Sequence, residues 1–268
     1  MAHLEYINQL AEIALRLYKM ANENIRQIEE KKPERSEVLV YYLGMLRRQA
    51  IMSYDLHVML KGRPEENLTT PYILLRSLMD DFLHVLYLDL HSNPPEKINR
   101  INAKGYKENF ESLKNLTNSK NQDYYGEKFD YLSQEQLEAL EATFMGKAEN
   151  KKYLNTNGDF KGFLQVRQVA DAIDGSEHCN VARDRAYYYW KSFSSFVHYS
   201  NWCYEYELVS DIIKLQHMEE CFQYVFNTIF LSFKHFNRTL SAPFACDRFL
   251  QEEMKFVLIN TAKEKNKL

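Results

Sequence analysis

The residues best suited to chemistry lie on two segments, each of which is apolar on most sides. The first covers residues 72–90 and reads YILLRSLMDDFLHVLYLDL. Five polar side chains, four in this segment and one directly after it, fall within an arc of roughly 80° on a helix that turns 100° per residue. They are Arg76, Asp80, His84, Tyr87 and His91. Because a buried arginine is costly unless it is paired, we expect Asp80 to be the partner of Arg76.

The second segment covers residues 183–206 and reads RDRAYYYWKSFSSFVHYSNWCYEY. Its polar positions recur at three- and four-residue steps and fall within an arc of roughly 100°. They are Asp184, Tyr187, Lys191, Ser194, His198 and Asn201. A histidine can act as a general base, and a lysine or arginine can stabilise a developing negative charge.

Two largely buried helices that each carry one polar stripe are expected to turn those stripes toward each other and form a polar seam or cleft. The candidate catalytic residues are His198, Arg76, Asp80, Ser194 and Lys191, and the candidate binding residues are His84, Tyr187 and Asn201. Each also has a structural interpretation. Arg76 with Asp80 can be a helix-stabilising ion pair, His198 a core histidine, and Ser194 the donor of a hydrogen bond within its helix.

The composition favours an all-α fold. The chain has 268 residues and is 45% hydrophobic and 14% aromatic, with only 8 Gly and 6 Pro. Few helix breakers in so long a chain indicate long helices rather than a many-stranded sheet. We expect a multi-helix bundle whose two central, mostly buried helices cover about 72–91 and 180–204. The net charge of −3 gives no general attraction to nucleic acid, although it leaves room for a local basic patch.

Apolar periodicity, caps and breakers predict the remaining helices. The expected helices cover about 2–30, 36–61, 71–91, 95–116, 133–146, 162–173, 180–204, 208–239 and 246–264. No strong linker divides the chain, so we expect a single domain over residues 1–268. It carries an irregular polar insertion at about 117–162, whose tail from Asn150 to Gly162 is expected to be a mobile loop or a small hairpin.

The chain is expected to be cytoplasmic. Its first residues, MAHLEYINQLAEIALRLYKM, lack the basic leader, apolar run and cleavage site of a signal peptide. No stretch of about 18 apolar residues occurs, so no membrane span is expected. The four cysteines show no C-x-x-C spacing and are expected to be reduced and buried.

Two stretches of the chain resemble the DUF5677 family of uncharacterised helical bacterial and archaeal proteins. PYILLRSLMDDFLHVLYL resembles the family's LLRSLxE helix, with Asp80 at the acidic position that is Glu in the family. YYYWKSFSSFVHYS resembles its second motif, a serine followed by an aliphatic residue and a histidine. The resemblance covers about 30 residues and implies that Arg76, Asp80, Ser194 and His198 share one site, but it implies no reaction.

A looser resemblance is to HEPN domains, helical bundles that often act as metal-independent ribonucleases in toxin and defence systems. Their signature is an arginine, four to six residues, and then a histidine on one helix. Arg76 and His84 are separated by seven residues, and the pair with six, Lys191 and His198, begins with lysine. The signature is therefore not met, although His198 with Arg76 or Lys191 is a chemically sufficient set for such cleavage.

Other chemistries have less support in the sequence. Asp80 with His84, and His217 with Cys221, have a spacing that suits two metal ligands on one helix, but neither has a further matching pair, so we expect no metal or other cofactor. Nucleotide-binding glycine motifs and the H-E-x-x-H and G-x-S-x-G motifs are absent.

Two hypotheses about function follow from the sequence. The chain is either a metal-independent ribonuclease of a defence or toxin system, or a non-catalytic ligand-binding or protein-interaction module whose polar seam is structural. The expected partners are RNA or a small ligand, together with a second copy of the chain in a homodimer, since aromatic-rich bundle faces often pack against a copy.

Overall fold

The computed structural model describes residues 2–31, 36–61, 69–91, 93–117, 132–198, 205, 209 and 211–240. Its helices are α1 (Ala2–Glu30), α2 (Glu37–Leu60), α3 (Thr69–Leu90), α4 (Pro94–Thr117), α6 (Gln134–Gly146), the 3₁₀ helix η2 (Ala148–Tyr153), α7 (Val166–Asp171), α8 (Glu177–Val197) and α10 (Asp211–Leu240). The only strand-type pairing among the described residues is an isolated β-bridge between Leu154 and Phe160. The predicted all-α fold is confirmed. None of the described helices is both long and apolar enough to cross a membrane.

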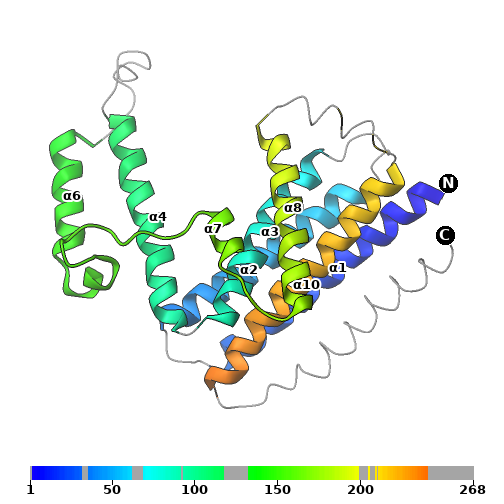
Figure 1. Ribbon diagram of the computed structural model, residues 1–268, viewed down its shortest axis with the longest axis horizontal. Helices are drawn as coiled ribbons and strands as arrows, with labels where there is room; N and C mark the ends of the chain where they lie inside the picture. Colours follow the sequence, from blue (N-terminus) through cyan, green and yellow to red (C-terminus); the bar gives the residue numbers. More distant parts are fainter. Residues whose placement is uncertain are drawn as a thin grey trace. The chain divides into compact units, whose positions relative to one another are not determined.

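The chain divides into two compact units, the first of which comprises residues 1–92 and 166–268. Its helices α1, α2, α3 and α10 run side by side as a bundle, and α8 packs along α3 (Figure 1). Helices α1 and α2 are antiparallel, because Tyr18 meets Tyr54 while Ala11 meets His57. Helix α10 contacts all three of its bundle neighbours.

Helix α3 lies at the centre of this first unit, as its sequence predicts. Its buried side chains include Leu75, Met79 and Phe82, and they point in several directions around the helix. A helix that is apolar on every side can be stable only if neighbours cover every side. Helices α2, α8 and α10 and the short helix α7 all contact it.

Helix α8 differs from its prediction in length and in burial. It ends at Val197 and not near residue 204, and His198 is its C-terminal capping residue. Its buried residues are Ala186, Tyr189 and Phe193, which form one face, whereas Val181 and Tyr188 are exposed. Helix α8 is therefore an outer layer on α3, and the expectation that it is mostly buried is wrong.

The second unit comprises residues 93–165 and contains α4, α6 and η2. Its core is a cluster of aromatic rings whose neighbouring centroids lie 4.7 to 6.3 Å apart. The rings belong to Tyr106, Phe110, Phe144, Tyr153 and Phe160. The predicted short helix is α6, and the predicted hairpin is the turn closed by the bridge from Leu154 to Phe160. The prediction of one domain over the whole chain stays a prediction, because compactness does not test independent folding.

The helix predicted at 162–173 is shorter than expected, since α7 covers only Val166–Asp171. The helix predicted at 246–264 lies outside the described residues. The remaining helix boundaries agree with the predictions within a few residues, which is the usual uncertainty of helix ends.

Candidate functional site

The two predicted polar stripes meet where α3 and α8 are in contact. Nε of Arg76 on α3 donates a hydrogen bond of 2.9 Å to Oγ of Ser194 on α8. One turn earlier on α3, the ring of Tyr72 stacks on that of Phe193, with centroids 4.7 Å apart. The apolar contact fixes the rotation of α8 about its axis, and this rotation brings Ser194 to Arg76.

The guanidinium of Arg76 also lies over an aromatic side chain that the sequence analysis did not select. Its Cζ is 5.1 Å from the ring centroid of Trp190, a cation–π distance. Trp190 stacks in turn on Tyr187, with centroids 5.7 Å apart and an interplanar angle of 15°. Ser194 donates its own hydroxyl proton to the carbonyl oxygen of Trp190 at 2.7 Å. Trp190 lies one helical turn before Ser194, and this spacing could have predicted that its ring lies beside Ser194 on α8.

The expected ion pair between Arg76 and Asp80 is absent from the described part of the chain. Nδ1 of His84 instead lies 3.0 Å from Oδ1 of Asp80 and 2.9 Å from its carbonyl oxygen. Burial alone would lower the pKa of His84, but the hydrogen bond and negative charge of Asp80 outweigh it, so the pKa lies above its usual value of 6.5. Asp80 is therefore a partner of His84, one turn farther along α3.

The polar residues on α3 consequently contact several different parts of the chain and do not line one cleft. His91, at its far end, donates from Nε2 to the carbonyl oxygen of Ala172 at 3.1 Å and packs on the ring of Tyr87, with centroids 4.2 Å apart. This end of the stripe holds the segment between α7 and α8 in place. The part of the stripe that could bind a ligand is therefore limited to Arg76 and its neighbours.

His198 lies at the end of α8, one turn after Ser194. Its backbone N–H donates to the carbonyl oxygen of Ser194 at 3.2 Å, and its side chain is exposed. Lys191, one turn before Ser194, is also exposed. The α8 stripe thus runs from a half-buried Ser194 to exposed ends, so His198 is not a core histidine. The predicted binding residue Asn201 lies outside the described residues.

The most deeply buried carboxylate of α3 is that of Asp81, which was not among the predicted site residues. It faces α2, where Nε2 of Gln49 donates to its Oδ2 at 2.8 Å and Nε of Arg48 lies 2.9 Å from the same atom. Burial is the largest influence and raises the pKa of Asp81 from 3.8 to about 7, although Arg48 acts against it. The Asp80–Asp81 doublet was the signal for this group, because neighbouring helical residues point about 100° apart.

A second polar cluster ties α8 to α10 around Glu220. This carboxylate accepts hydrogen bonds from Nε and Nη2 of Arg185, from the hydroxyl of Tyr189 at 2.7 Å and from that of Tyr224 at 2.8 Å. Burial raises the pKa of Glu220, but these hydrogen bonds outweigh burial and the pKa is lowered. Because Arg185, Tyr189 and Tyr224 all bond to this one carboxylate, the cluster holds α8 against α10.

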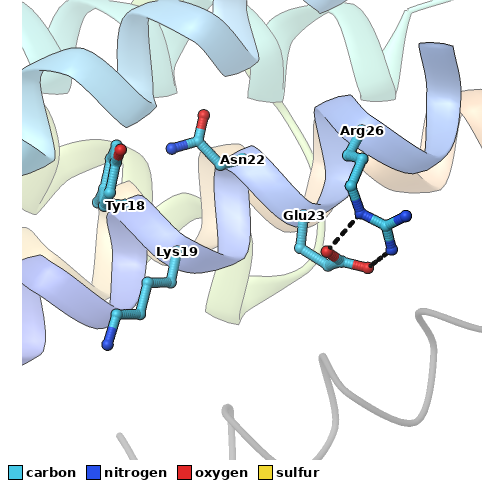
Figure 2. A pocket seen from close by; sticks show the side chains of 5 residues that line it. All are labelled: Tyr18, Lys19, Asn22, Glu23 and Arg26. Atoms are coloured by element: carbon cyan, nitrogen blue, oxygen red, sulfur yellow. Dashed lines mark hydrogen bonds and ion pairs between the residues drawn. The ribbon is translucent and has the colours of Figure 1, made fainter.

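A pocket lies on α1, and its five labelled side chains all come from that helix: Tyr18, Lys19, Asn22, Glu23 and Arg26 (Figure 2). Nε and Nη2 of Arg26 both donate to the carboxylate of Glu23 (Figure 2). None of the predicted site residues lines it. Among the described residues, no three histidine, cysteine or acidic side chains lie close enough together to hold a metal ion.

Comparisons with protein-family models, with curated proteins and with solved structures find no match to this chain. The resemblances to the DUF5677 family and to HEPN domains therefore stay predictions.

Proposed function

We propose that this chain is a metal-independent ribonuclease that acts in the cytoplasm, and that Arg76, Ser194 and His198 form its reactive site. The observation that carries the proposal is the environment of Arg76. Its half-buried guanidinium is held by Ser194 and Trp190, and among the described residues no carboxylate pairs with it. An oriented arginine without a carboxylate is suited to bind an external oxyanion such as a phosphate.

The chemistry follows from the positions of the groups. Within the described residues, Nη1 and Nη2 of Arg76 have no acceptor, so they are available for two oxygens of one phosphodiester. His198, exposed one turn beyond Ser194, would accept the proton of the ribose 2′-hydroxyl. The 2′-oxygen would attack phosphorus, the bond from phosphorus to the 5′-oxygen would break, and water would protonate that oxygen. The products would be a 2′,3′-cyclic phosphate and a 5′-hydroxyl.

The test is RNA cleavage by the purified chain in EDTA, with and without the proposed base. We expect His198→Ala to lower the cleavage rate by about 100-fold or more, the usual loss on removal of a general base. His178→Ala is the matched control, because His178 is an exposed histidine at the opposite end of α8. It is expected to cleave as the wild type does.

Two results would contradict the proposal. One is RNA that stays intact with the wild-type chain, and the other is equal cleavage by the wild type and His198→Ala. Cleavage lost in both histidine variants would indicate a general effect on α8 rather than general-base catalysis, and would count against His198 as the base.

The second candidate function is a non-catalytic ligand-binding or protein-interaction module. It is favoured by the stack of Arg76, Trp190 and Tyr187, which also suits an arginine that serves only to pack α8 on α3. Arg76→Lys separates the two candidates. Lysine keeps the charge but cannot reproduce the planar fork, so a ribonuclease should lose most activity, while a packing role should show a small loss of stability alone.

A further inference from the structure

The outer face of α2 carries a series of apolar side chains that the described part of the chain leaves exposed. Val40, Ile51, Tyr54 and Val58 have exposed fractions of 57%, 62%, 46% and 54%. They belong to a series with alternating three- and four-residue spacing over the whole helix. The series is Glu37, Val40, Gly44, Arg47, Ile51, Tyr54, Val58 and Lys61. This is the spacing of core positions in a coiled coil.

The opposite face of α2 already packs into the bundle. Its buried side chains Leu39, Tyr42, Leu46, Gln49, Ser53, Leu56 and Leu60 follow the same alternating spacing. Helix α2 is therefore apolar on two opposite sides. One side is buried in the bundle, while on the outer side Tyr54 packs on Tyr18 of α1 and Arg47 pairs with Glu29, but its apolar side chains stay exposed. A helix with two apolar faces is expected to bury both, so we expect another surface to pack on the outer face.

We propose that the outer stripe of α2 is a homodimer interface in which α2 packs antiparallel against α2 of a second copy. A two-fold axis through the outer face at the level of residue 49 would place Val40 against Val58 of the copy and Arg47 against Ile51 of the copy. The stem of Arg47 can cover Ile51 while its guanidinium keeps its contact with Glu29 on α1. The same axis would place Glu37 against Lys61 of the copy, so opposite charges meet at both ends.

Gly44 supplies an independent argument for a copy as the occupant. Glycine in the middle of a helix is unfavourable, and no contact in the described part of the chain requires it, because a Cβ built there meets no atom within 4 Å. In the antiparallel pairing Gly44 lies opposite Tyr54 of the copy. The smallest residue of the stripe thus meets the largest, which lets the two helices approach closely.

This interface does not depend on the ribonuclease proposal, and sedimentation equilibrium of the full chain tests it directly. The expected mass is twice that of the 31.9 kDa chain. Ile51→Arg should weaken association by about tenfold or more, because it places an unpaired charge in the interface beside Arg47 of the copy. Val181→Arg is the matched control, since Val181 on α8 is an apolar residue with a similar exposed fraction of 51%. It should stay dimeric.

Gly44→Leu separates association from folding. A leucine should stabilise the isolated helix, since space is open around Gly44, but it should fill the space meant for Tyr54 of the copy. At a concentration where the wild type is monomeric, the melting temperature of Gly44→Leu should be no lower than that of the wild type. Its dimerisation should nevertheless be weaker. A wild type that is monomeric at all concentrations, or a dimer that neither Ile51→Arg nor Gly44→Leu weakens, would overturn the proposal.

Cross-linking tests the antiparallel register. In one helix Val40 and Val58 are about 27 Å apart, far beyond the reach of a disulfide, so cysteines there can join only two copies. Val40→Cys with Val58→Cys should give a covalent dimer under mild oxidation, whereas Val40→Cys alone should not exceed the background of the parent chain. Cross-linking by Val40→Cys alone would mean that the helices pair in parallel and would overturn this register.

Discussion

The hydrogen bond of 2.9 Å from Nε of Arg76 to Oγ of Ser194 joins two helices whose residues here stand 118 positions apart in the chain. It shows that the polar stripes of α3 and α8 face each other at one level of the bundle. On α3 only the Arg76 end of the stripe takes part, because Asp80 binds His84 and His91 binds the backbone at Ala172.

Arg76→Ala should cost a moderate amount of stability. The variant loses one charged hydrogen bond and one cation–π contact, but no ion pair, so we expect a decrease of about 1–3 kcal/mol in the free energy of unfolding. Urea unfolding at neutral pH measures it. Lys191→Ala, an exposed cation one turn from Ser194, should change stability by less than about 0.5 kcal/mol. A loss above about 4 kcal/mol would indicate a buried ion pair that Arg76 does not make here.

Glu220→Gln should lower stability because the carboxylate joins α8 to α10. We expect a loss of about 1–3 kcal/mol at neutral pH, since Arg185 and two tyrosine hydroxyls lose an ionised acceptor. The folded pKa of Glu220 is lowered, so this stabilisation is present above the unfolded pKa of 4.5 and is lost as the pH falls through the folded value.

The matched control for Glu220→Gln is Glu23→Gln, which removes a carboxylate that also accepts two nitrogens of one arginine. Because Arg26 and Glu23 lie at the surface of α1, that change should cost about 0.2–1 kcal/mol. Equal costs for the two variants would show that burial of Glu220 adds nothing to its hydrogen bonds.

Most of the helical fold can be predicted from the sequence, because periodicity and breakers mark the helices. The end of α8 could not be predicted in this way, since the run from Tyr187 to Asn201 contains no glycine or proline and α8 still stops at Val197. The aromatic core of residues 93–165 could not be predicted either, because its aromatic residues are widely separated in the sequence of a segment that is otherwise polar.

The polar partners were harder to predict than the helices that carry them. The spacing of Arg76 and Asp80 permits a local ion pair, and the packing of Trp190 and Ser194 decides against it. The sequence also could not distinguish Asp80 from Asp81. Helix α3 is apolar on every side, so its pattern contains no exposed face from which the direction of either carboxylate could be judged.

His84 should titrate above its usual pKa of 6.5, and Asp80 should be the cause. A proton NMR titration of the histidine rings measures it, with His84→Gln used to assign the signal. Asp80→Asn removes the negative charge beside Nδ1 and leaves the opposing effect of burial, so the pKa of His84 should fall. An unchanged pKa in Asp80→Asn would show that another group holds the proton on His84.

The same pair predicts a pH dependence of stability. Because the folded pKa of His84 is raised, its stabilisation is fully present below the unfolded pKa of 6.5 and is lost as the pH rises through the folded value. The free energy of unfolding of the wild type, minus that of His84→Gln, should therefore decrease as the pH rises above 6.5 through the folded pKa of His84.

Asp81 should produce a pH dependence of stability that differs from that of an ordinary aspartate. Its folded pKa of about 7 lies above the unfolded value of 3.8, so the folded chain binds the proton more tightly. Between these two pH values the folded state holds more protons than the unfolded state, and stability must fall as the pH rises. Above about pH 7 the carboxylate is ionised in both states and the loss is complete. The difference between the two pKa values corresponds to about 4 kcal/mol of stability.

Asp81→Asn isolates this contribution, because asparagine cannot ionise and can still accept a hydrogen bond from Gln49. In urea unfolding from pH 4.5 to pH 8, the wild type should lose stability relative to Asp81→Asn as the pH rises, and the difference should level off near neutrality. The ion pair with Arg48 works against this trend, but Arg48 is half exposed and its attraction is screened by water, so burial should prevail. If the wild type instead gains stability relative to Asp81→Asn with rising pH, then Arg48 and Gln49 hold the carboxylate ionised and its folded pKa lies below 3.8.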